Sequence, residues 1–209
     1  MILEIFEIMF SEVAFGDCKN NTTEVNYLNY WKTVLAVAFR GTEIKLRIGK
    51  STSASAKFDR MINEIEYGET STYISGRKID MIVEIKSINT KNMPITIELS
   101  NTEFKKIDVD DDSIIIQQNK NIRTSKSILS SIFTLNSGEP VIRLDFVGLS
   151  GYLFSAQYLE SAVFIIREAD VYLPGDTIDF NEFIDESEDV LALIFGYGNY
   201  IVKQHMINV

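Results

Sequence analysis

Two stretches of alternating apolar and polar residues constrain the fold of this chain more than any other feature. They are GRKIDMIVEI, residues 76–85, and ITIELSNTEFKK, residues 95–106. In the first stretch Ile79, Met81, Val83 and Ile85 alternate with mostly polar residues, and alternation with a period of two is typical of a half-buried β-strand. The same parity continues through residues 95–100, and the nine residues between them predict a hairpin loop. The pair therefore predicts two neighbouring antiparallel strands.

The alternation also places Asp80 and Glu98 on one polar face of these two strands. Side chains directly opposite each other on adjacent strands have Cβ atoms about 4.5–5.5 Å apart. Mg²⁺ prefers hard oxygen ligands and is commonly bound by one or two carboxylates together with water and phosphate oxygens. The shared face is therefore compatible with a bound Mg²⁺ ion that has Asp80 and Glu98 as ligands. The structural alternative is a polar sheet face on which Asp80 pairs with Arg77 or Lys78 and Glu98 contacts water.

The rest of the chain predicts a mixed α/β fold in which a central mixed β-sheet is flanked by helices. Helical spacing of apolar residues is found in residues 22–39, 114–133 and about 179–196, and less clearly in 53–66. Residues 43–48 alternate like a strand, and two or three further strands are expected between residues 141 and 174. No linker or internal repeat divides the chain. We therefore expect a single domain over residues 1–209, with its core at about 22–170.

Composition excludes several classes of function. The chain has one cysteine, Cys18, and one histidine, His205, so neither a Cys/His zinc site nor a Cys/His catalytic pair is supported. Motifs of phosphate-binding loops, dinucleotide-binding folds, serine hydrolases and zinc proteases are missing from the sequence. No apolar run approaches the roughly 20 residues of a membrane span. We therefore expect an intracellular protein, cytoplasmic or nuclear, with no membrane partner.

Charge is distributed unevenly along the chain. The net charge of −10 argues against nonspecific attraction of the whole molecule to nucleic acid. Residues 76–126, however, contain nine basic and eight acidic side chains, and the predicted helix 114–133 carries Lys120, Arg123 and Lys126 at intervals of three. These three residues are candidates for contact with nucleic-acid phosphates, or they form the solvated face of that helix. Gln118 falls near the apolar stripe of the same helix, where a buried amide needs a partner.

The order of these segments resembles the core of the PD-(D/E)XK nuclease superfamily. The resemblance lies in a helix, a strand with Asp80, a neighbouring strand with Glu98 in ELS, and a later helix with a glutamine and basic residues. It implies Mg²⁺ held by the Asp and the Glu, with a lysine two residues after the Glu that helps to activate water. It also implies a further carboxylate from an early helix, for which Glu24 is available. The strings GRKID, ELSNTEFKK and QQNKNIRTSKSIL are also similar to those of a group of mucoromycete fungal proteins with no known activity.

The chain departs from the superfamily pattern at the lysine, because Ser100 stands two residues after Glu98. One solution takes Glu103, Phe104 and Lys105 as the ExK triplet, which requires a β-bulge near residues 100–102. Another is a lysine that reaches the site from elsewhere, namely Lys105, Lys106 or Lys120.

The resemblance predicts a Mg²⁺-dependent phosphodiesterase acting on nucleic acid. Lys105, Lys120 and Gln118 are then the predicted catalytic side chains. If the lysine is lost, the alternative is a non-catalytic interaction module that retains the scaffold.

Overall fold

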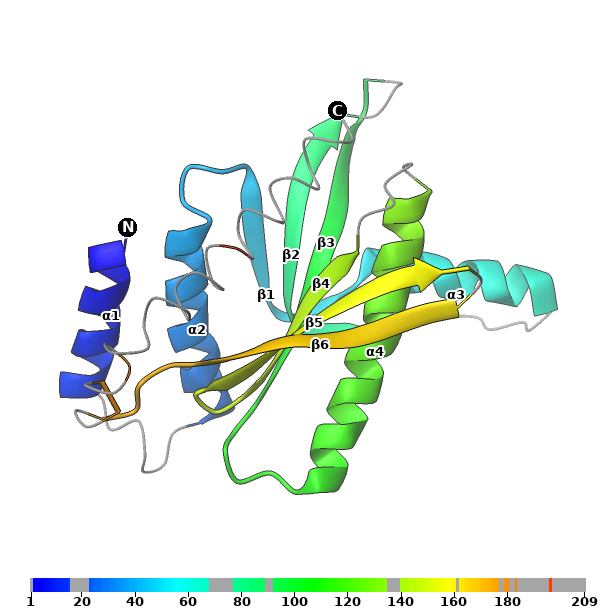
Figure 1. Ribbon diagram of the computed structural model, residues 1–209. Helices are drawn as coiled ribbons and strands as arrows, with labels where there is room; N and C mark the ends of the chain where they lie inside the picture. The colour runs from blue at the N-terminus through cyan, green and yellow to red at the C-terminus, as the bar shows by residue number, and fades with distance from the viewer. Residues whose placement is uncertain are drawn as a thin grey trace.

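The fold is built around one mixed β-sheet. A computed structural model describes residues 2–15, 23–67, 77–88, 92–134, 140–160 and 162–176, together with 179, 180, 183 and 196. Within these ranges six strands lie in the order β1-β2-β3-β4-β5-β6 (Figure 1). The strands are β1 (Ile44–Thr52), β2 (Lys78–Ile88), β3 (Pro94–Lys105), β4 (Val141–Val147), β5 (Ser150–Leu159) and β6 (Ala162–Tyr172). The predicted mixed α/β class and the predicted pair of strands at β2 and β3 are confirmed.

One pair of neighbouring strands is parallel and the other pairs among the described strands are antiparallel. β1, β2 and β3 form an antiparallel meander, β3 and β4 are parallel, and β4, β5 and β6 are again antiparallel. A parallel pair needs a long crossover connection, which is usually a helix. Here the crossover is α4 (Asp111–Phe133), so this helix is placed across the sheet at the junction of β3 and β4. The remaining helices are α1 (Ile2–Phe15), α2 (Glu24–Ala38) and α3 (Ala54–Tyr67).

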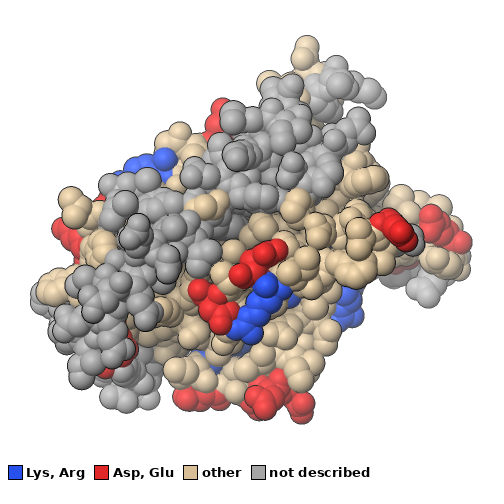
Figure 2. Space-filling view, viewed as in Figure 1, with Lys and Arg blue, Asp and Glu red and all other residues tan. Residues whose placement is uncertain are grey.

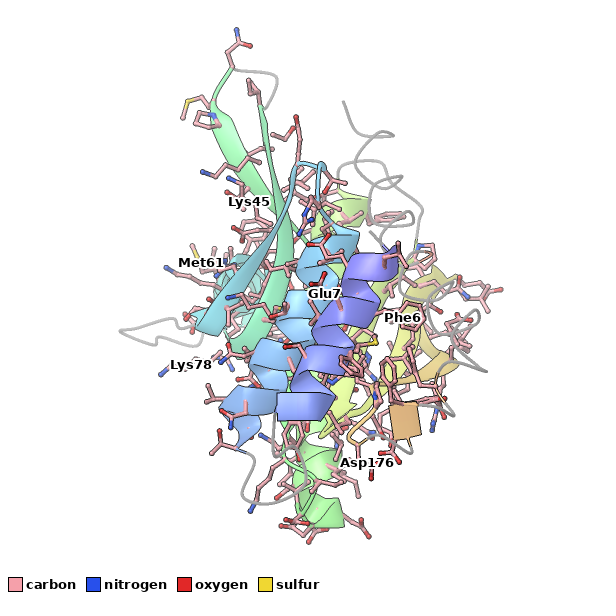
Figure 3. The ribbon with its side chains drawn as sticks, turned by 90° about the vertical axis from the view of Figure 1, so that its left-hand side faces the viewer. Phe6, Glu7, Lys45, Met61, Lys78 and Asp176 are labelled. Atoms are coloured by element: carbon pink, nitrogen blue, oxygen red, sulfur yellow. The ribbon has the colours of Figure 1, made fainter. Side chains whose placement is uncertain are left out.

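Helices α2 and α4 cover opposite faces of the sheet. The indole ring of Trp31 in α2 lies 4.1 Å from the ring of Phe146, centroid to centroid. Asn121 in α4 donates a hydrogen bond to Asp145, the neighbour of Phe146 on β4. Because successive side chains of a strand point to opposite faces, the two helices must lie on different sides. The views agree, with α1 packed outside α2 as a further layer (Figures 1 and 3).

The sequence explains where α2 begins and what it buries. Thr23 is its N-cap and accepts a hydrogen bond from the backbone of Asn26 at 3.3 Å, and Glu24 follows in the first turn, where the helix dipole favours a negative charge. The Trp31 indole donates to the backbone carbonyl of Gly148 at 3.2 Å, so the ring is both packed and hydrogen-bonded. The predicted helix over residues 22–39 is confirmed within the described residues.

Helix α4 buries the side predicted by its apolar residues only in its last part, where Leu129 and Ile132 are buried. Asp110 caps it and accepts the Ser113 backbone N–H at 2.7 Å, a bond that holds the Asp110 pKa below its usual value. In the predicted helix 114–133, helical spacing places Ile115 and Phe133 on the same apolar stripe as Leu129 and Ile132, but they are 52% and 57% exposed. Along the first four turns the buried side chains are polar instead: Gln117, Asn121, Thr124 and Ser125. The underside of this helix is therefore polar where it crosses β3 and β4, and apolar only toward its end.

The other sequence predictions have mixed outcomes. The strands expected between residues 141 and 174 are β4, β5 and β6, and the helical periodicity of 53–66 corresponds to α3. The expected closing helix at 179–196 falls largely outside the described residues, although Phe180 and Phe183 are buried against the core. None of the helices in the described part of the chain is long and apolar enough to cross a membrane.

Candidate active site

A β-bulge in β3 determines which carboxylates can meet. Val83 pairs with Ser100, but the next residue of β2, Glu84, pairs with Glu98, so Leu99 is an extra residue on β3. Leu99 is 2% exposed and belongs to the hydrophobic core. A bulge of this kind changes the parity of the strand, because two residues occupy the space of one. Residues after the bulge therefore point to the face opposite the one expected from residues 95–99.

The change of parity brings Glu103, rather than Glu98, to Asp80. Asp80 Oδ2 accepts a hydrogen bond from the backbone N–H of Phe104 at 3.1 Å, and Asp80 exerts a direct electrostatic effect on Glu103. Glu98 instead lies opposite Glu84, four residues further along β2. The prediction that Asp80 and Glu98 lie opposite each other is therefore wrong, because the register of the hairpin places them four positions apart along the sheet, and the bulge turns Glu103 to the face of Asp80. The alternative with a bulge, which uses Glu103, Phe104 and Lys105, describes the observed geometry.

A second irregularity flanks Asp80 on its other side. In the pairing of β1 with β2, Ile48 faces Met81 and Ser51 faces Ile79, so two residues of β1 stand where Asp80 has a single position. One of them, Gly49, has a φ of +95°, a left-handed conformation that glycine adopts without strain. Bulges are frequent beside active sites because they redirect a side chain and interrupt the ladder. Asp80 thus lies opposite a bulge in β1 and three residues before the point at which the bulge in β3 shifts the ladder.

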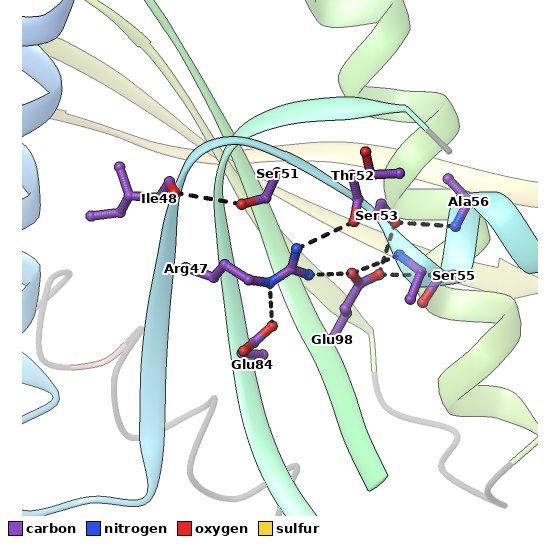
Figure 4. Close-up of polar contacts among 10 residues, drawn as sticks. Arg47, Ile48, Ser51, Thr52, Ser53, Ser55, Ala56, Glu84 and Glu98 are labelled. Atoms are coloured by element: carbon purple, nitrogen blue, oxygen red, sulfur yellow. Dashed lines mark hydrogen bonds and ion pairs between the residues drawn. The ribbon is translucent and has the colours of Figure 1, made fainter. Parts of the chain in front are cut away.

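Glu98 has a structural role at the start of α3 (Figure 4). One carboxylate oxygen accepts from the guanidinium of Arg47 at 2.7 Å and from the backbone N–H of Ala54 at 2.9 Å. The other accepts from the Ser53 hydroxyl at 2.8 Å and from the backbone N–H of Ser55 at 3.0 Å. Arg47 also binds Glu84 at 2.6 Å. Four donors thus satisfy this buried carboxylate, which compensates the positive end of the helix dipole.

Glu98→Gln tests this role. The substitution keeps the shape of the side chain, removes its negative charge and places an amide NH₂ against N–H donors. We expect the free energy of unfolding to fall by about 2 kcal/mol, the upper range for a charge at a partly buried helix terminus. Urea denaturation followed by circular dichroism measures the change. Asp170→Asn, which removes an exposed carboxylate on β6, is the control; an equal effect of the two substitutions would contradict the assignment.

Glu103 has an unusual protonation equilibrium. The residue is 2% exposed, and burial raises the pKa of its carboxyl group to about 7, with the negative charge of Asp80 adding to the shift. Lys120 opposes the shift through a hydrogen bond and its charge, and Lys105 opposes it through its charge. A carboxyl group with a pKa near 7 beside a second carboxylate is typical of sites that bind a cation or transfer protons.

Two lysines from different elements lie at this carboxyl group. Lys120 Nζ on α4 is 2.7 Å from Glu103 Oε1. Lys105, two residues after Glu103 on β3, places its Nζ 3.3 Å from Glu24 Oε2 at the start of α2. Lys106 is exposed beyond the end of β3. Among the three lysines that the sequence made available, Lys105 and Lys120 are therefore the two that the structure brings to Glu103.

The glutamine that faces the sheet is Gln117, one residue before the one the sequence suggested. Gln118 is only partly buried, and its backbone carbonyl accepts from Arg143 at 3.3 Å. Gln117 is 3% exposed, and neither its amide oxygen nor its amide nitrogen has a hydrogen-bond partner among the described residues. It lies one turn before Lys120 on α4. Burial of an amide without hydrogen-bond partners costs free energy. A bound ligand or water molecule would supply partners to this side chain.

A buried polar network fixes α4 on the sheet beneath these residues. Asn121 bonds to Asn101 of β3 on one side and to Asp145 of β4 on the other. Ser125 donates to Asn101 at 2.9 Å. Asp145 pairs in register with Glu103 on the adjacent strand, but its carboxylate is engaged by Asn121 and lies 3.4 Å from Arg143. The network holds the helix that carries Lys120 and Gln117, and it occupies Asp145.

The residues present fit a divalent cation of the magnesium type. Asp80 and Glu103 are two buried carboxylates whose charges repel each other, and a cation relieves that repulsion. Within the described ranges no three Asp, Glu, His or Cys side chains converge. Such an ion would have two protein carboxylates and complete its coordination with water and phosphate oxygens, which is the usual arrangement for Mg²⁺.

The basic residues predicted to meet nucleic acid have separate environments. Lys120 points inward to Glu103, whereas Arg123 and Lys126 are exposed on α4. On the face drawn in Figure 2, Lys and Arg side chains stand in small groups beside Asp and Glu, without a broad basic field in its described part. Any attraction to phosphates must therefore be local, consistent with the net charge of −10.

The candidate site consists of Asp80, Glu103 and Lys105, with Lys120 of α4 at Glu103 and Glu24 beside Lys105. Gln117 lies one turn before Lys120 on the buried side of the same helix. Sequence reasoning carried a signal for Glu103, the ExK triplet, but none that separates Gln117 from Gln118. We compared the chain with models of protein families, with curated proteins and with solved structures, and it matches none of them.

Proposed function

We propose that the protein is a Mg²⁺-dependent nuclease of the PD-(D/E)XK type. The observation that carries this proposal is the meeting of Asp80 on β2 with Glu103 on β3, followed two residues later by Lys105. This is the Asp and ExK combination that the superfamily resemblance implies. Its triplet begins at Glu103, five residues after Glu98, where it was first expected. The two buried carboxylates and the adjacent ammonium suit phosphodiester hydrolysis, in which negative charge accumulates on phosphate oxygens.

The order of the elements supports the same proposal. The chain order is α2, β1, α3, β2, β3, α4 and β4. Apart from α3, which stands between β1 and β2, this is the order on which the resemblance rests: a helix, strands with the Asp and the Glu, a helix and a strand. We assign these elements to a restriction-endonuclease-like core. The assignment accounts for why α2 carries Glu24 to Lys105 and why α4 carries Lys120 to Glu103.

Each side chain has a role that follows from its contacts. Asp80 and Glu103 would hold the ion, with Asp80 fixed by the Phe104 backbone. Bound Mg²⁺ lowers the pKa of a water ligand and neutralises charge on the scissile phosphate. Lys105 supplies a positive charge and a proton-transfer group beside Glu103, and Glu24 orients its ammonium group. Lys120 neutralises Glu103 when no cation does so.

Gln117 completes the set as an orienting group. Its amide offers two donors and one acceptor that no described residue uses. A substrate phosphate or the attacking water can form hydrogen bonds with this amide. The free-energy cost of the unpaired amide is then removed only when substrate is bound. Interactions of this kind favour the reacting complex over the free protein.

Cleavage assays on the purified chain test the proposal. We expect cleavage of DNA or RNA oligonucleotides with Mg²⁺ or Mn²⁺, none with EDTA, and a loss of activity in Asp80→Asn. Asp170→Asn, the same chemical change at an exposed position of β6, is the control and should cleave normally. Wild-type protein that binds Mg²⁺ by calorimetry without cleaving any oligonucleotide would support the non-catalytic interaction module. Equal cleavage by both variants would contradict the site.

A further inference from the structure

Helix α3 turns its apolar side away from the rest of the protein. Phe58, Met61, Ile62 and Ile65 have the spacing i, i+3, i+4 and i+7, which places them on one stripe of the helix. Phe58 is 58% exposed, Ile65 is 77% exposed, and Met61 and Ile62 are each 38% exposed. A stripe of this kind normally faces the core of its own protein. Here it is available to another molecule.

The helix packs on α4 through a different side. Its two buried side chains are Ser55 and Ala56, and Asp59 accepts a hydrogen bond from the Ser127 hydroxyl of α4 at 3.0 Å. This side is centred about a third of the circumference away from the apolar stripe. The far part of α3 extends past α4 at the rim of the molecule (Figure 1). The contact with α4 therefore leaves the apolar stripe uncovered.

The charges of α3 favour a protein surface over a membrane surface as the partner of this stripe. The helix carries two basic side chains, Lys57 and Arg60, and three acidic ones, Asp59, Glu64 and Glu66. Helices that lie on membranes have a polar face rich in lysine and arginine. The net charge of −10 would also oppose contact with anionic lipids. Exposed apolar patches with a polar rim are typical of sites that bind proteins.

The apolar stripe is complementary to a second copy of itself. Its spacing is the same when it is followed in either direction. Two α3 helices packed antiparallel about a two-fold axis between Met61 and Ile62 therefore bring each Met61 to Ile62 of the other copy. The same rotation brings each Phe58 to Ile65 of the other copy. Both copies then use the same patch, as in most homodimers, and the opposed helix dipoles attract each other.

The charges beside the stripe agree with this antiparallel arrangement. Lys57 and Glu64 are seven residues apart, which is about two turns, and they lie on the same flank of the stripe. In the antiparallel pair this flank faces its own copy, so each Lys57 meets Glu64 of the other chain. A parallel pair would instead bring Glu64 toward Glu66. On the opposite flank Asp59 is held against α4 by Ser127.

We propose that two copies of this chain associate through α3, with the apolar stripes packed antiparallel and two Lys57–Glu64 ion pairs at their flank. Stable interfaces bury about 800 Å² on each partner, which is more than one short stripe supplies. The dimer is therefore reversible, with a Kd on the order of 10⁻⁵ M. The inference is independent of the proposed nuclease function, because none of these residues belongs to the candidate active site.

Sedimentation equilibrium of the full chain tests the dimer. The wild type should pass from monomer to dimer between about 1 and 300 μM, a range that brackets this Kd. Ile65→Glu should weaken association at least about tenfold, because each dimer would bury two new carboxylates. Ile116→Glu is the matched control: it makes the same change on α4, where Ile116 is 67% exposed, and should dimerise like the wild type. Circular dichroism verifies that both variants are folded.

Exchange of the flanking charges tests the orientation of the helices. Lys57→Glu and Glu64→Lys each place like charges across the interface and should each weaken association roughly fivefold. The double variant exchanges the two charges and should return to within about twofold of the wild-type affinity. Loss of folding cannot produce this recovery.

Three results would overturn the proposal. A wild type that stays monomeric over the whole concentration range would assign the stripe to a different protein. An Ile65→Glu variant that dimerises as well as Ile116→Glu would place the interface elsewhere. Tighter association of Glu64→Lys, or a double variant that does not recover, would contradict the antiparallel arrangement.

Discussion

Lys105→Met should lower the rate of oligonucleotide cleavage by about 10²–10⁴-fold, the range for removal of a positioned acid–base group. Methionine keeps the length of the lysine side chain and removes its charge. Mg²⁺ binding should persist, because Asp80 and Glu103 retain their carboxylates. The charge of Lys105 also lowers the pKa of Glu103. Its loss should therefore raise that pKa further, and the remaining activity and the Mg²⁺ affinity should both shift to higher pH.

Two variants make this result specific. Lys106→Met changes the adjacent, exposed lysine in the same way and should cleave at the wild-type rate. Lys105→Arg keeps the positive charge and should retain more activity than Lys105→Met. Single-turnover rates and calorimetric Mg²⁺ titrations distinguish a lost catalytic charge from a lost metal site. If Lys105→Met cleaves as fast as Lys106→Met, Lys120 rather than Lys105 is the lysine of the reaction.

Glu103→Gln should abolish cleavage and at the same time stabilise the protein above pH 7. The folded pKa of Glu103 is about 7 against an ordinary value of 4.5. Between these values the folded protein binds more protons than the unfolded chain, so its stability falls as the pH rises. The difference in pKa corresponds to about 3 kcal/mol. The free energy that folding loses by ionising Glu103 is zero below pH 4.5 and reaches its full value above pH 7. Glutamine is neutral at every pH and has no such cost.

Denaturation at two pH values without divalent metal measures this effect. At pH 8 Glu103→Gln should exceed the wild type in unfolding free energy by about 3 kcal/mol, and at pH 4 the two proteins should be equal. Lys120 loses its partner in the variant, but its side chain is 33% exposed and reaches water. Mg²⁺ should reduce the difference at pH 8, since only the wild type binds it there. A variant less stable than the wild type at pH 8 would show that Glu103 is ionised and stabilising in the native protein.

The period-two and helical patterns predicted most of the elements because those patterns reflect burial on one side. The strands β2 and β3, the helix α2 and the crossover helix all lie where the sequence places them. The partner of Asp80 was not predictable in the same way. Leu99 is an ordinary apolar residue, and nothing in its side chain distinguishes a bulged position from a paired one. With the bulge, Glu98 can bind the start of α3 while Phe104 points into the core. Both are contacts between segments that are distant in the sequence.

The buried side of α4 escaped prediction for a related reason. Asn121 and Ser125 have the composition of a solvated helix face, and burial of such residues is favourable only when partners are present. Asn101 and Asp145 are those partners, and they come from two other strands. A sequence pattern records hydrophobicity, not complementarity between polar groups. The pattern therefore predicted the helix correctly and placed Leu129 and Ile132 on its inner face, but it missed the polar residues that are buried along the first four turns.

The extra residue at Leu99 also restricts how the length of this chain can change. Glu98 anchors a helix and Glu103 belongs to the candidate active site. Their orientations depend on the alternation of side chains along β3, which the bulge at Leu99 reverses between them. Deletion of a single residue between them, or insertion of one, would turn Glu103 into the core and Phe104 outward. Length changes in the connections before β2 or after β3 would leave the orientations of both side chains unchanged. Among proteins built on this plan, the interval from Glu98 to Glu103 should therefore keep its length even where the amino acids within it differ.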